Sequence, residues 1–182
     1  MNQFSENGLR LLKEWEGSRS AMYRDSAGLP TIGVGHLLTR SELTSGKILI
    51  KGQPTKYSLG LSDRAILDLL AQDVHPVELC VKIFMGVSLN QNQFDALVSF
   101  VFNVGKGAFQ GSTLLKLLNQ GNYAAVPEQL RRWTRAGGQV IHGLEVRREN
   151  EIKLWNQPVD QALSVGDVSP SAVEQDARRG TA

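Results

Sequence analysis

Apolar residues recur three or four positions apart over most of the chain, which is the spacing of one face of a helix. Near the start, Leu9, Leu12 and Trp15 follow this spacing. Ser5, a residue type that caps helices, precedes them, and Gly17, a residue type common just past a helix, follows them. We therefore predict a first helix between Ser5 and Gly17.

The pattern changes over residues 18–36. Gly28 marks a turn there, and the segment 31–35 (TIGVG) is short and partly β-branched, so we predict a small antiparallel sheet. Residues 44–60 are rich in Thr, Ser, Gly and Lys. Within them, the apolar run 48–50 (ILI) fits either a short strand or a turn of helix.

Helical spacing returns further along the chain. A long pattern begins after Ser62 and contains Pro76, which we expect to kink or split the helix because proline lacks an N–H and crowds the preceding turn. Another helix is predicted from Asn90 to a stop near Gly105. Three shorter helices are predicted after it, with a break at Gly137-Gly138 before the last of them: 112–119, 127–135 and 143–155.

The order of these elements indicates the fold class. One helix, a small sheet and then many helices predict an α+β protein, in which a small N-terminal antiparallel sheet lobe is joined by the long helix to a larger helical lobe. A cleft between two lobes is the natural place for a ligand. The length of 182 residues suits one compact domain, or two small lobes that share a helix.

Composition narrows the class of protein. A single cysteine, Cys80, excludes an internal disulfide and the zinc sites that need two or more cysteines, and we expect it to be a small core residue. The longest apolar runs are only a few residues, and residues 2–6 are mostly polar, so we expect neither a membrane helix nor a signal peptide. We therefore expect a chain that folds in a reducing cytosol.

Charge is distributed unevenly along the chain. Residues 158–182 carry a net charge of −2, whereas residues 1–157 carry +4. A mildly basic body weakly favours an anionic partner. After Trp155 the large apolar residues nearly vanish, so we predict that residues 158–182 form a polar, flexible tail.

Three residues near the N-terminus are candidates for joint chemistry. Glu16 ends the first predicted helix, Asp25 follows nine residues later, and Thr31 follows six residues after that. A chain that leaves a helix and turns back through a hairpin can bring these side chains to one rim. Two carboxyl groups facing one bond are what glycoside hydrolysis needs, one protonated and the other ionised. Spacing alone also fits a simpler interpretation, in which Glu16 is a helix-end charge and Asp25 a turn residue.

The segment 16–39 (EGSRSAMYRDSAGLPTIGVGHLLT) resembles the signature of tailed-phage lysozymes, glycoside hydrolase family 24. That signature is Glu-Gly, an Asp nine residues after the Glu, and a Thr six residues later within TIGxGH, and this chain matches all of it. Further segments resemble the lobe-linking, central and closing helices of the family: 60–74, 89–105 and 143–155. The resemblance implies a lysozyme-like catalytic domain over residues 1–157, with the polar tail 158–182 outside it.

The resemblance implies a role for each of the three residues. Glu16 would be the general acid that protonates the glycosidic oxygen, Asp25 would hold or activate the water, and Thr31 would help to position that water. The family reaction is inverting, which needs the two carboxyl groups roughly 6.5–9.5 Å apart, whereas retention needs about 5–5.5 Å. The bond cleaved would be the β-1,4 link between N-acetylmuramic acid and N-acetylglucosamine in peptidoglycan.

The resemblance also implies residues that line the sugar groove. These are Leu37, Phe102 and Ser112, although the register at the last position could slip by one residue to Thr113. Leu37 and Phe102 fit equally well as core residues. An amide side chain expected from the family falls at Pro127 here, where proline is acceptable as the first residue of a helix.

Other ionisable residues have more than one interpretation. His36 fits a structural histidine, bonded within its lobe, better than a catalytic base. Arg147 and Arg148 are either a solvated charge pair, or one of them reaches across the cleft to orient Glu16, as a basic residue does in relatives. Three histidines without metal-ligand spacing argue against a metal site, and we expect no cofactor.

The resemblance therefore predicts a phage endolysin that hydrolyses peptidoglycan. Its partner would be the glycan strand; we expect a monomer with no nucleic-acid partner and no stable membrane insertion. It would wait in the host cytoplasm and reach the periplasmic wall once the membrane is permeabilised. Two alternatives keep the fold: a lytic transglycosylase, which uses one Glu and no catalytic water, and a glycan-binding module without activity. A nucleic-acid binder would rest only on the pairs Arg131-Arg132 and Arg147-Arg148.

Overall fold

A computed structural model describes residues 2–158 of the chain. Helices and short strands follow one another in this order: α1 (Glu6–Glu16), β1 (Arg19–Arg24), β2 (Pro30–Gly33), β3 (His36–Leu37), α2 (Arg40–Ser45), β4 (Lys47–Ile50), β5 (Gln53–Lys56), α3 (Asp63–Phe84), α4 (Gln91–Val104), α5 (Lys106–Gln110), α6 (Thr113–Asn119), the 3₁₀ helix η1 (Tyr123–Ala125), α7 (Val126–Arg131), β6 (Arg135–Ala136), β7 (Gln139–Val140) and α8 (His142–Asn156).

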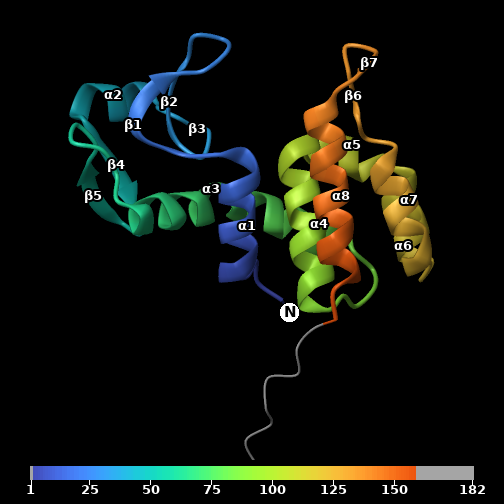
Figure 1. Cartoon of the computed structure of the whole chain (residues 1–182). Helices are drawn as coiled ribbons and strands as arrows, with labels where there is room; N and C mark the ends of the chain where they lie inside the picture. Colours follow the sequence, from blue (N-terminus) through green and yellow to red (C-terminus); the bar gives the residue numbers. More distant parts are fainter. Residues whose placement is uncertain (1, 159–182) are drawn as a thin grey trace, which may run out of the picture.

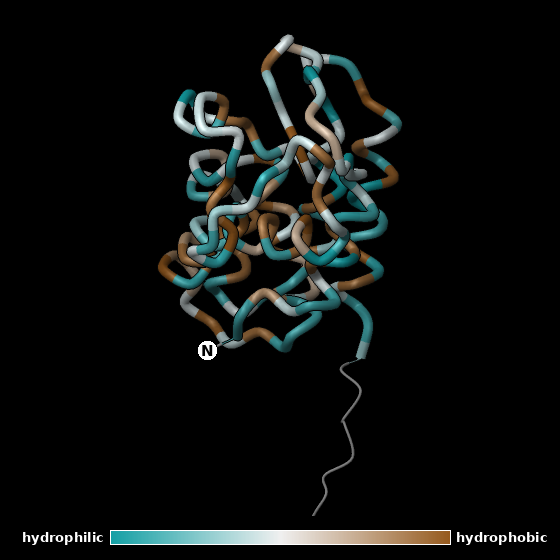
Figure 2. Tube along the Cα trace, turned by 90° about the vertical axis from the view of Figure 1, so that its left-hand side faces the viewer, coloured by the Kyte–Doolittle hydropathy of each residue, from teal (hydrophilic) through white to brown (hydrophobic). Residues whose placement is uncertain are grey.

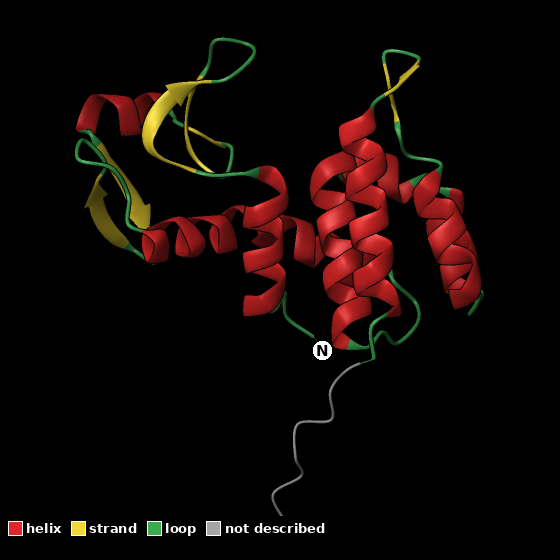
Figure 3. Ribbon diagram, in the orientation of Figure 1, coloured by secondary structure: helices red, strands yellow, loops and turns green. Residues whose placement is uncertain are grey.

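These elements form two groups joined by helices. Strands β1–β5 and α2 lie on one side of the molecule, α4–α8 lie on the other, and α3 runs from one group to the other with α1 beside it (Figures 1 and 3). The predicted α+β architecture, with a small sheet lobe and a larger helical lobe, is confirmed. Hydrophobic and hydrophilic residues are interspersed along residues 2–158 (Figure 2), and none of the described helices is long and apolar enough to span a membrane.

The predicted sheet in residues 18–36 is present. Strands β1, β2 and β3 pair in that order, all antiparallel, with Thr31 opposite Tyr23 on one side and opposite Leu37 on the other. Residues 48–50 belong to strand β4, which pairs with β5, so the strand interpretation of that run is the correct one. The side chain of Gln72 on α3 donates to the carbonyl of Leu49 at 2.9 Å, which anchors this hairpin to α3.

Helix α1 begins and ends where the sequence predicts. The Ser5 side chain accepts a hydrogen bond from the amide of Gly8, and Gly17 ends the helix with φ at 73°. The amide of Ser5 also donates to Asp95 of α4 at 3.0 Å. A Cβ atom at Gly8 would lie 2.9 Å from the Asp95 carboxyl carbon, so only glycine allows α1 to approach α4 this closely. The start of α1 is therefore fixed to the helical lobe.

Helix α3 is one continuous helix, and the prediction that Pro76 could split it is wrong. The Ser62 side chain caps its start, as expected. The missing N–H of Pro76 leaves the carbonyl of Gln72 without its helical donor. Buried apolar residues lie on both sides of the proline, including Leu70 and Val81. Packing of both halves against neighbouring elements outweighs the local cost of the proline.

Helix α7 ends earlier than predicted. It stops at Arg131 rather than at residue 135, because the following residues form the two-stranded hairpin β6–β7. Gly137 and Gly138 both adopt positive φ, at 57° and 81°, which is the backbone of a tight hairpin turn. Pro127 stands in the first turn of α7, where its missing N–H costs nothing.

The core of the larger lobe is built around α4, which contacts α1, α3, α5 and α8. All eight residues from Phe94 to Val101 are buried. Cys80 of α3 is also buried, as predicted. Two of the buried α4 residues, Asp95 and Ser99, are polar and are hydrogen-bonded to other elements. The second of these, Ser99, belongs to the candidate site.

Candidate functional site

Glu16 lies where three elements meet. It is the last residue of α1, it is followed within three residues by β1, and its carboxylate accepts a hydrogen bond from Arg147 of α8. Its side chain is 30% exposed, whereas that of Arg147 is 7% exposed. The carboxyl group of Glu16 is thus accessible from outside and held from behind by a buried guanidinium group.

Asp25 lies at the turn between β1 and β2. Its Oδ1 atom accepts hydrogen bonds from the amides of Ala27 at 2.9 Å and Leu29 at 2.8 Å. The simpler interpretation of Asp25 as a turn residue is therefore correct, but it accounts for only one of the two carboxylate oxygens. One oxygen is used for the turn, while Oδ2 has no hydrogen bond among the described residues, so the turn fixes the carboxylate and leaves one oxygen for a ligand.

Thr31 is joined to Asp25 through a single residue. The Thr31 hydroxyl donates to the carbonyl of Leu29 at 3.0 Å, and the amide of that same Leu29 donates to Asp25. Thr31 is 1% exposed and sits in β2, so its position is well fixed. Because its proton is used for Leu29, the hydroxyl oxygen retains lone pairs that can accept a further hydrogen bond. The hairpin thus brings these two residues together.

Arg147 belongs to a buried cluster of charged and polar side chains from α4 and α8. It donates from Nε to Glu151 at 3.1 Å and from Nη2 to the carbonyl of Ser99 at 3.2 Å. Arg148 lies against the other oxygen of Glu151 at 3.1 Å and donates to Asn103 at 2.9 Å. The interpretation of residues 147 and 148 as a solvated charge pair is wrong, and the arginine that reaches Glu16 is Arg147.

Burial and charge act in opposite directions on this cluster. Burial raises the pKa of Glu151, while the guanidinium groups of Arg148 and Arg147 and a hydrogen bond from Ser99 lower it. Burial lowers the pKa of Arg148, and the Glu151 carboxylate opposes that shift. Each buried charge therefore has a partner of opposite sign. Sequence reasoning missed Glu151 and Ser99; the spacing of Glu151, three and four residues after two arginines, was the available signal.

Three of the four arginines on which a nucleic-acid binder would rest are buried or paired with a carboxylate. Arg147 and Arg148 are buried. Arg131 makes an ion pair with Glu149 at 2.7 Å. Only Arg132 among these four arginines has no ion pair among the described residues. The described structure therefore offers no basic stripe at these positions.

His36 has a structural role. Its Nδ1 atom lies 3.0 Å from the carboxylate of Asp73 on α3, and its Nε2 atom lies 3.4 Å from Glu42 on α2. The hydrogen bond with Asp73 raises the pKa of His36, although burial acts against the shift. His36 therefore ties β3 to α2 and α3 and is not positioned as a catalytic base. Within residues 2–158, no group of three or more His, Cys, Asp or Glu residues gathers as a metal site.

The residues expected along the sugar groove have different environments. Leu37 is 50% exposed on β3, so its interpretation as a core residue is wrong. Phe102 is partly buried against the core of the large lobe. Ser112 is buried and caps α6 through Leu115 at 3.0 Å. A hollow of about 370 Å³ next to Ser112 is lined by residues of α5–α7 and their connections, including Trp133.

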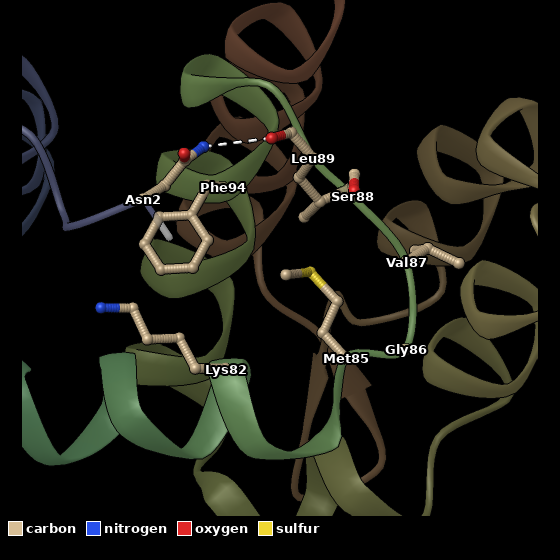
Figure 4. A pocket seen from close by; sticks show the side chains of 8 residues that line it. All are labelled: Asn2, Lys82, Met85, Gly86, Val87, Ser88, Leu89 and Phe94. Atoms are coloured by element: carbon tan, nitrogen blue, oxygen red, sulfur yellow. Dashed lines mark hydrogen bonds between the residues drawn. The ribbon is translucent and has the colours of Figure 1, made fainter.

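A larger pocket of about 470 Å³ lies elsewhere (Figure 4). It is lined by Asn2, Lys82, Met85, Gly86, Val87, Ser88, Leu89 and Phe94. The Asn2 side chain closes one side by donating to the Leu89 carbonyl at 3.1 Å. Asn2 precedes the start of α1, whereas Glu16 ends it, and a helix of this length spans roughly 16 Å. This pocket is therefore separate from the Glu16 site.

Comparison with known proteins gives a consistent result. The family model described as phage lysozyme matches residues 13–151, an interval that contains Glu16, Asp25, Thr31 and Arg147. The endolysin of Salmonella phage P22 is 42% identical over 137 residues, which is 75% of this chain and 87% of that protein. The endolysin of Bacillus phage PZA is 36% identical over 172 residues, which is 92% of this chain but only 60% of that protein.

Solved structures share the fold. A crystal structure of a P22 lysozyme mutant superposes with a TM-score of 0.72 at 40% sequence identity, and the match covers 85% of this chain and 99% of that one. Both lobes and the connecting helix are therefore elements that this chain shares with a protein of known structure.

Proposed function

Because the chain belongs to the phage lysozyme family and is therefore a peptidoglycan-degrading hydrolase, we propose that it cleaves the β-1,4 bond between N-acetylmuramic acid and N-acetylglucosamine with inversion. The observation that carries the proposal is the placement of Glu16. Its carboxyl group is partly exposed at the junction of the two lobes and is held there by the buried Arg147.

Glu16 acts as the general acid in this proposal. A proton delivered to the glycosidic oxygen lets the leaving sugar depart as an alcohol, while positive charge develops on the ring of the other sugar. Such a step requires a carboxyl group that reaches the bond in a fixed direction. The hydrogen bond from Arg147 supplies the direction, and the partial exposure of the Glu16 side chain supplies the access.

Asp25 and Thr31 act on the water in this proposal. The free Oδ2 atom of Asp25 accepts a proton or a hydrogen bond from a water molecule, and the Thr31 oxygen accepts a second one, which orients the water toward the anomeric carbon. Their common link to Leu29 fixes the two acceptors relative to each other. Inversion follows if the water attacks the face opposite the leaving group, for which the carboxyl groups of Glu16 and Asp25 need to be roughly 6.5–9.5 Å apart.

The glycan strand and the biological setting complete the proposal. Leu37, Phe102 and Ser112 contribute to binding the strand. We propose that the chain acts as a monomer, without a cofactor, and that residues 1–157 suffice as the catalytic domain. The relatives are named endolysins. By analogy, the chain would accumulate in the host cytoplasm and degrade the periplasmic wall after the membrane is permeabilised.

The decisive variant is Glu16→Gln, which keeps the shape of the side chain and removes its acidic proton. We expect it to fold as the wild type does, which circular dichroism checks, and to release reducing ends from purified peptidoglycan at least about 100-fold more slowly, since general acids contribute this much or more. Glu14→Gln, the same change on an exposed residue of the same helix, should retain full activity. Equal rates for wild type and Glu16→Gln would refute the assignment.

Product analysis separates the proposal from its alternatives. A lytic transglycosylase leaves anhydro-muramyl ends, whereas hydrolysis leaves reducing ends, and mass spectrometry of the digest distinguishes the two. The fixed Asp25–Thr31 pair favours hydrolysis because it provides for a water that a transglycosylase does not use. A glycan-binding module would give no new ends of either kind.

A further inference from the structure

The cluster behind Glu16 is centred on Glu151. This residue is completely buried in α8. Its Oε1 atom accepts hydrogen bonds from Arg147 Nε at 3.1 Å and from the Ser99 hydroxyl at 2.9 Å, and its Oε2 atom lies 3.1 Å from Nε of Arg148. None of these contacts faces the solvent. The carboxylate of Glu151 therefore connects both arginines without touching Glu16.

The contacts of Arg147 fix its orientation. A guanidinium group is planar and presents its N–H groups in a rigid fork. Nε is held by Glu151, and Nη2 is held by the carbonyl of Ser99 at 3.2 Å. With two of the three nitrogens fixed, the direction of Nη1 is determined, and Nη1 is the atom that donates to Glu16. The direction of the Glu16 carboxyl group is thus set by residues on α4 and α8.

Charge balance requires a second carboxylate in this cluster. The charged groups that face Arg147 are Glu16 of α1 and Glu151 and Arg148 of α8. Without Glu151, two guanidinium groups would lie behind Glu16 with no other anion described beside them. Their combined charge would favour the ionised form of a nearby carboxyl group, and an ionised carboxylate has no proton to donate. Glu151 offsets this charge.

We propose that Glu151 is a positioning residue for glycoside hydrolysis. Acting through Arg147, it directs the carboxyl group of Glu16 and offsets the positive charge behind it. Buried ion pairs are often no more stabilising than apolar residues of similar volume, so stability alone is a weak reason for placing this carboxylate in the core. The inference rests on the proposed function, because it assigns a task in a reaction for which Glu16 supplies the proton.

Glu151→Gln tests the proposal. The amide oxygen can keep the hydrogen bonds that Oε1 accepts, but the side chain loses its negative charge. Its NH₂ group would also face Nε of Arg148, which lies 3.1 Å from Oε2, so two donors would oppose each other and the cluster would shift. We expect kcat on purified peptidoglycan to fall roughly 10-fold or more, because small misplacements of a reacting group are costly, with KM little changed. We also expect the alkaline limb of the pH–activity profile to move to lower pH. A purely structural role would leave that limb in place.

Glu149→Gln is the matched control. Glu149 lies on the same helix, two residues before Glu151, and its partner is Arg131 at the surface, at 2.7 Å. The chemical change is identical, but the pair does not touch the cluster behind Glu16. This variant should keep the wild-type kcat and pH profile. A folded Glu151→Gln protein that behaves as this control does would overturn the proposal.

A second variant covers the case in which Glu151→Gln does not fold. Replacing Arg148 and Glu151 together by Met removes one positive and one negative charge, so no new unpaired charge is buried. Arg147 then loses its Nε partner, and the same fall in kcat is expected. Wild-type kcat in this folded double variant would contradict the positioning role.

A readout independent of activity separates this inference from the proposed function. In the wild type, the Nε–H proton of Arg147 should exchange slowly with solvent by nitrogen-resolved NMR, and in the Glu151→Gln variant it should exchange faster. If the wild-type protein releases no ends from peptidoglycan, the proposed function fails, while this exchange measurement still tests whether Glu151 holds Arg147. Unchanged exchange in the variant would show that it does not.

Discussion

Single ionisable residues set how this fold responds to pH, and His36 is the clearest case. Its ring lies 3.0 Å from Asp73, whose hydrogen bond raises the pKa of His36 above its ordinary value of 6.5. A raised pKa in the folded state means that the contribution of the pair to stability is fully present below about pH 6.5 and is lost as the pH rises through the folded pKa. The small lobe is therefore tied to α3 most firmly in mild acid.

The variant Asp73→Asn tests whether the protonation of His36 stabilises the fold. We expect the variant to lower the free energy of unfolding by about 1.5–3 kcal/mol at pH 5.5, the range for hydrogen bonds to charged groups, and by clearly less at pH 9. Chemical denaturation of both proteins at the two pH values measures the difference. Asp63→Asn is the control, because Asp63 is 88% exposed beside Lys13. A difference that does not change with pH would mean that His36 is not the titrating group.

The site could be predicted from sequence only where its residues are close along the chain. Glu16, Asp25 and Thr31 lie within one helix–hairpin segment, so their spacing carries information about their proximity. The partner of Glu16 is 131 residues away, and spacing does not say which face of α8 meets α1. Glu151 lies behind that partner, where only the packing of α4 on α8 brings it into contact with Ser99.

Helices and strands could be predicted where a local signal, such as a capping side chain, marks where they begin or end. Ser62 and Asn90 cap α3 and α4 as predicted, because a side chain that satisfies free amides acts locally. Helix α2 was missed, although Thr39 and Glu42 form a complete capping box at its start. The predicted end of α7 was wrong because Gly137-Gly138 forms the turn of the hairpin β6–β7 rather than only a break. That outcome depends on pairing between strands of two residues each.

At the scale of one helix, replacement of Pro76 should change the stability of α3. It is exposed on α3, so alanine would restore a donor for the Gln72 carbonyl without disturbing the core. We expect Pro76→Ala to raise the free energy of unfolding by about 1–3 kcal/mol, up to the difference in helix propensity. Thermal unfolding measures this, with His75→Ala as an exposed neighbouring control. A lower melting temperature would show that the packing of α3 depends on a backbone shape that only proline favours here.

At the scale of the molecule, the two lobes are connected twice. Helix α3 is the covalent connection, and α1 is bonded to the large lobe at both ends, through Ser5 to Asp95 and through Glu16 to Arg147. The order of sequence patterns was enough to predict two lobes. It did not show that the candidate acid is itself one of the contacts between them, which only the family resemblance offered, as one of two alternatives for Arg147 and Arg148. The predicted tail lies outside the described residues, apart from Pro158, which accepts from Asn92 at 3.2 Å.

At the scale of the whole molecule, the uneven distribution of charge predicts how removal of the acidic C-terminal segment affects activity. Removing residues 159–182 takes the net charge from +2 to +4 and leaves Glu16, Asp25, Thr31 and Arg147 in the chain. We expect the shortened chain to retain kcat within about 2-fold, as measured by release of reducing ends, because it keeps the whole proposed catalytic domain and every residue assigned to the reaction.

The same truncation should change how salt affects activity on the wall. A more positive chain approaches an anionic polymer faster when charges are unscreened, and screening is nearly complete at 1 M salt, where the Debye length is about 3 Å. The shortened chain should therefore exceed the full chain on whole walls at low salt, and the two should converge at high salt. Identical salt dependence would show that the acidic segment does not influence approach to the wall. A loss of kcat in the shortened chain at every salt concentration would instead assign residues 159–182 a direct part in activity.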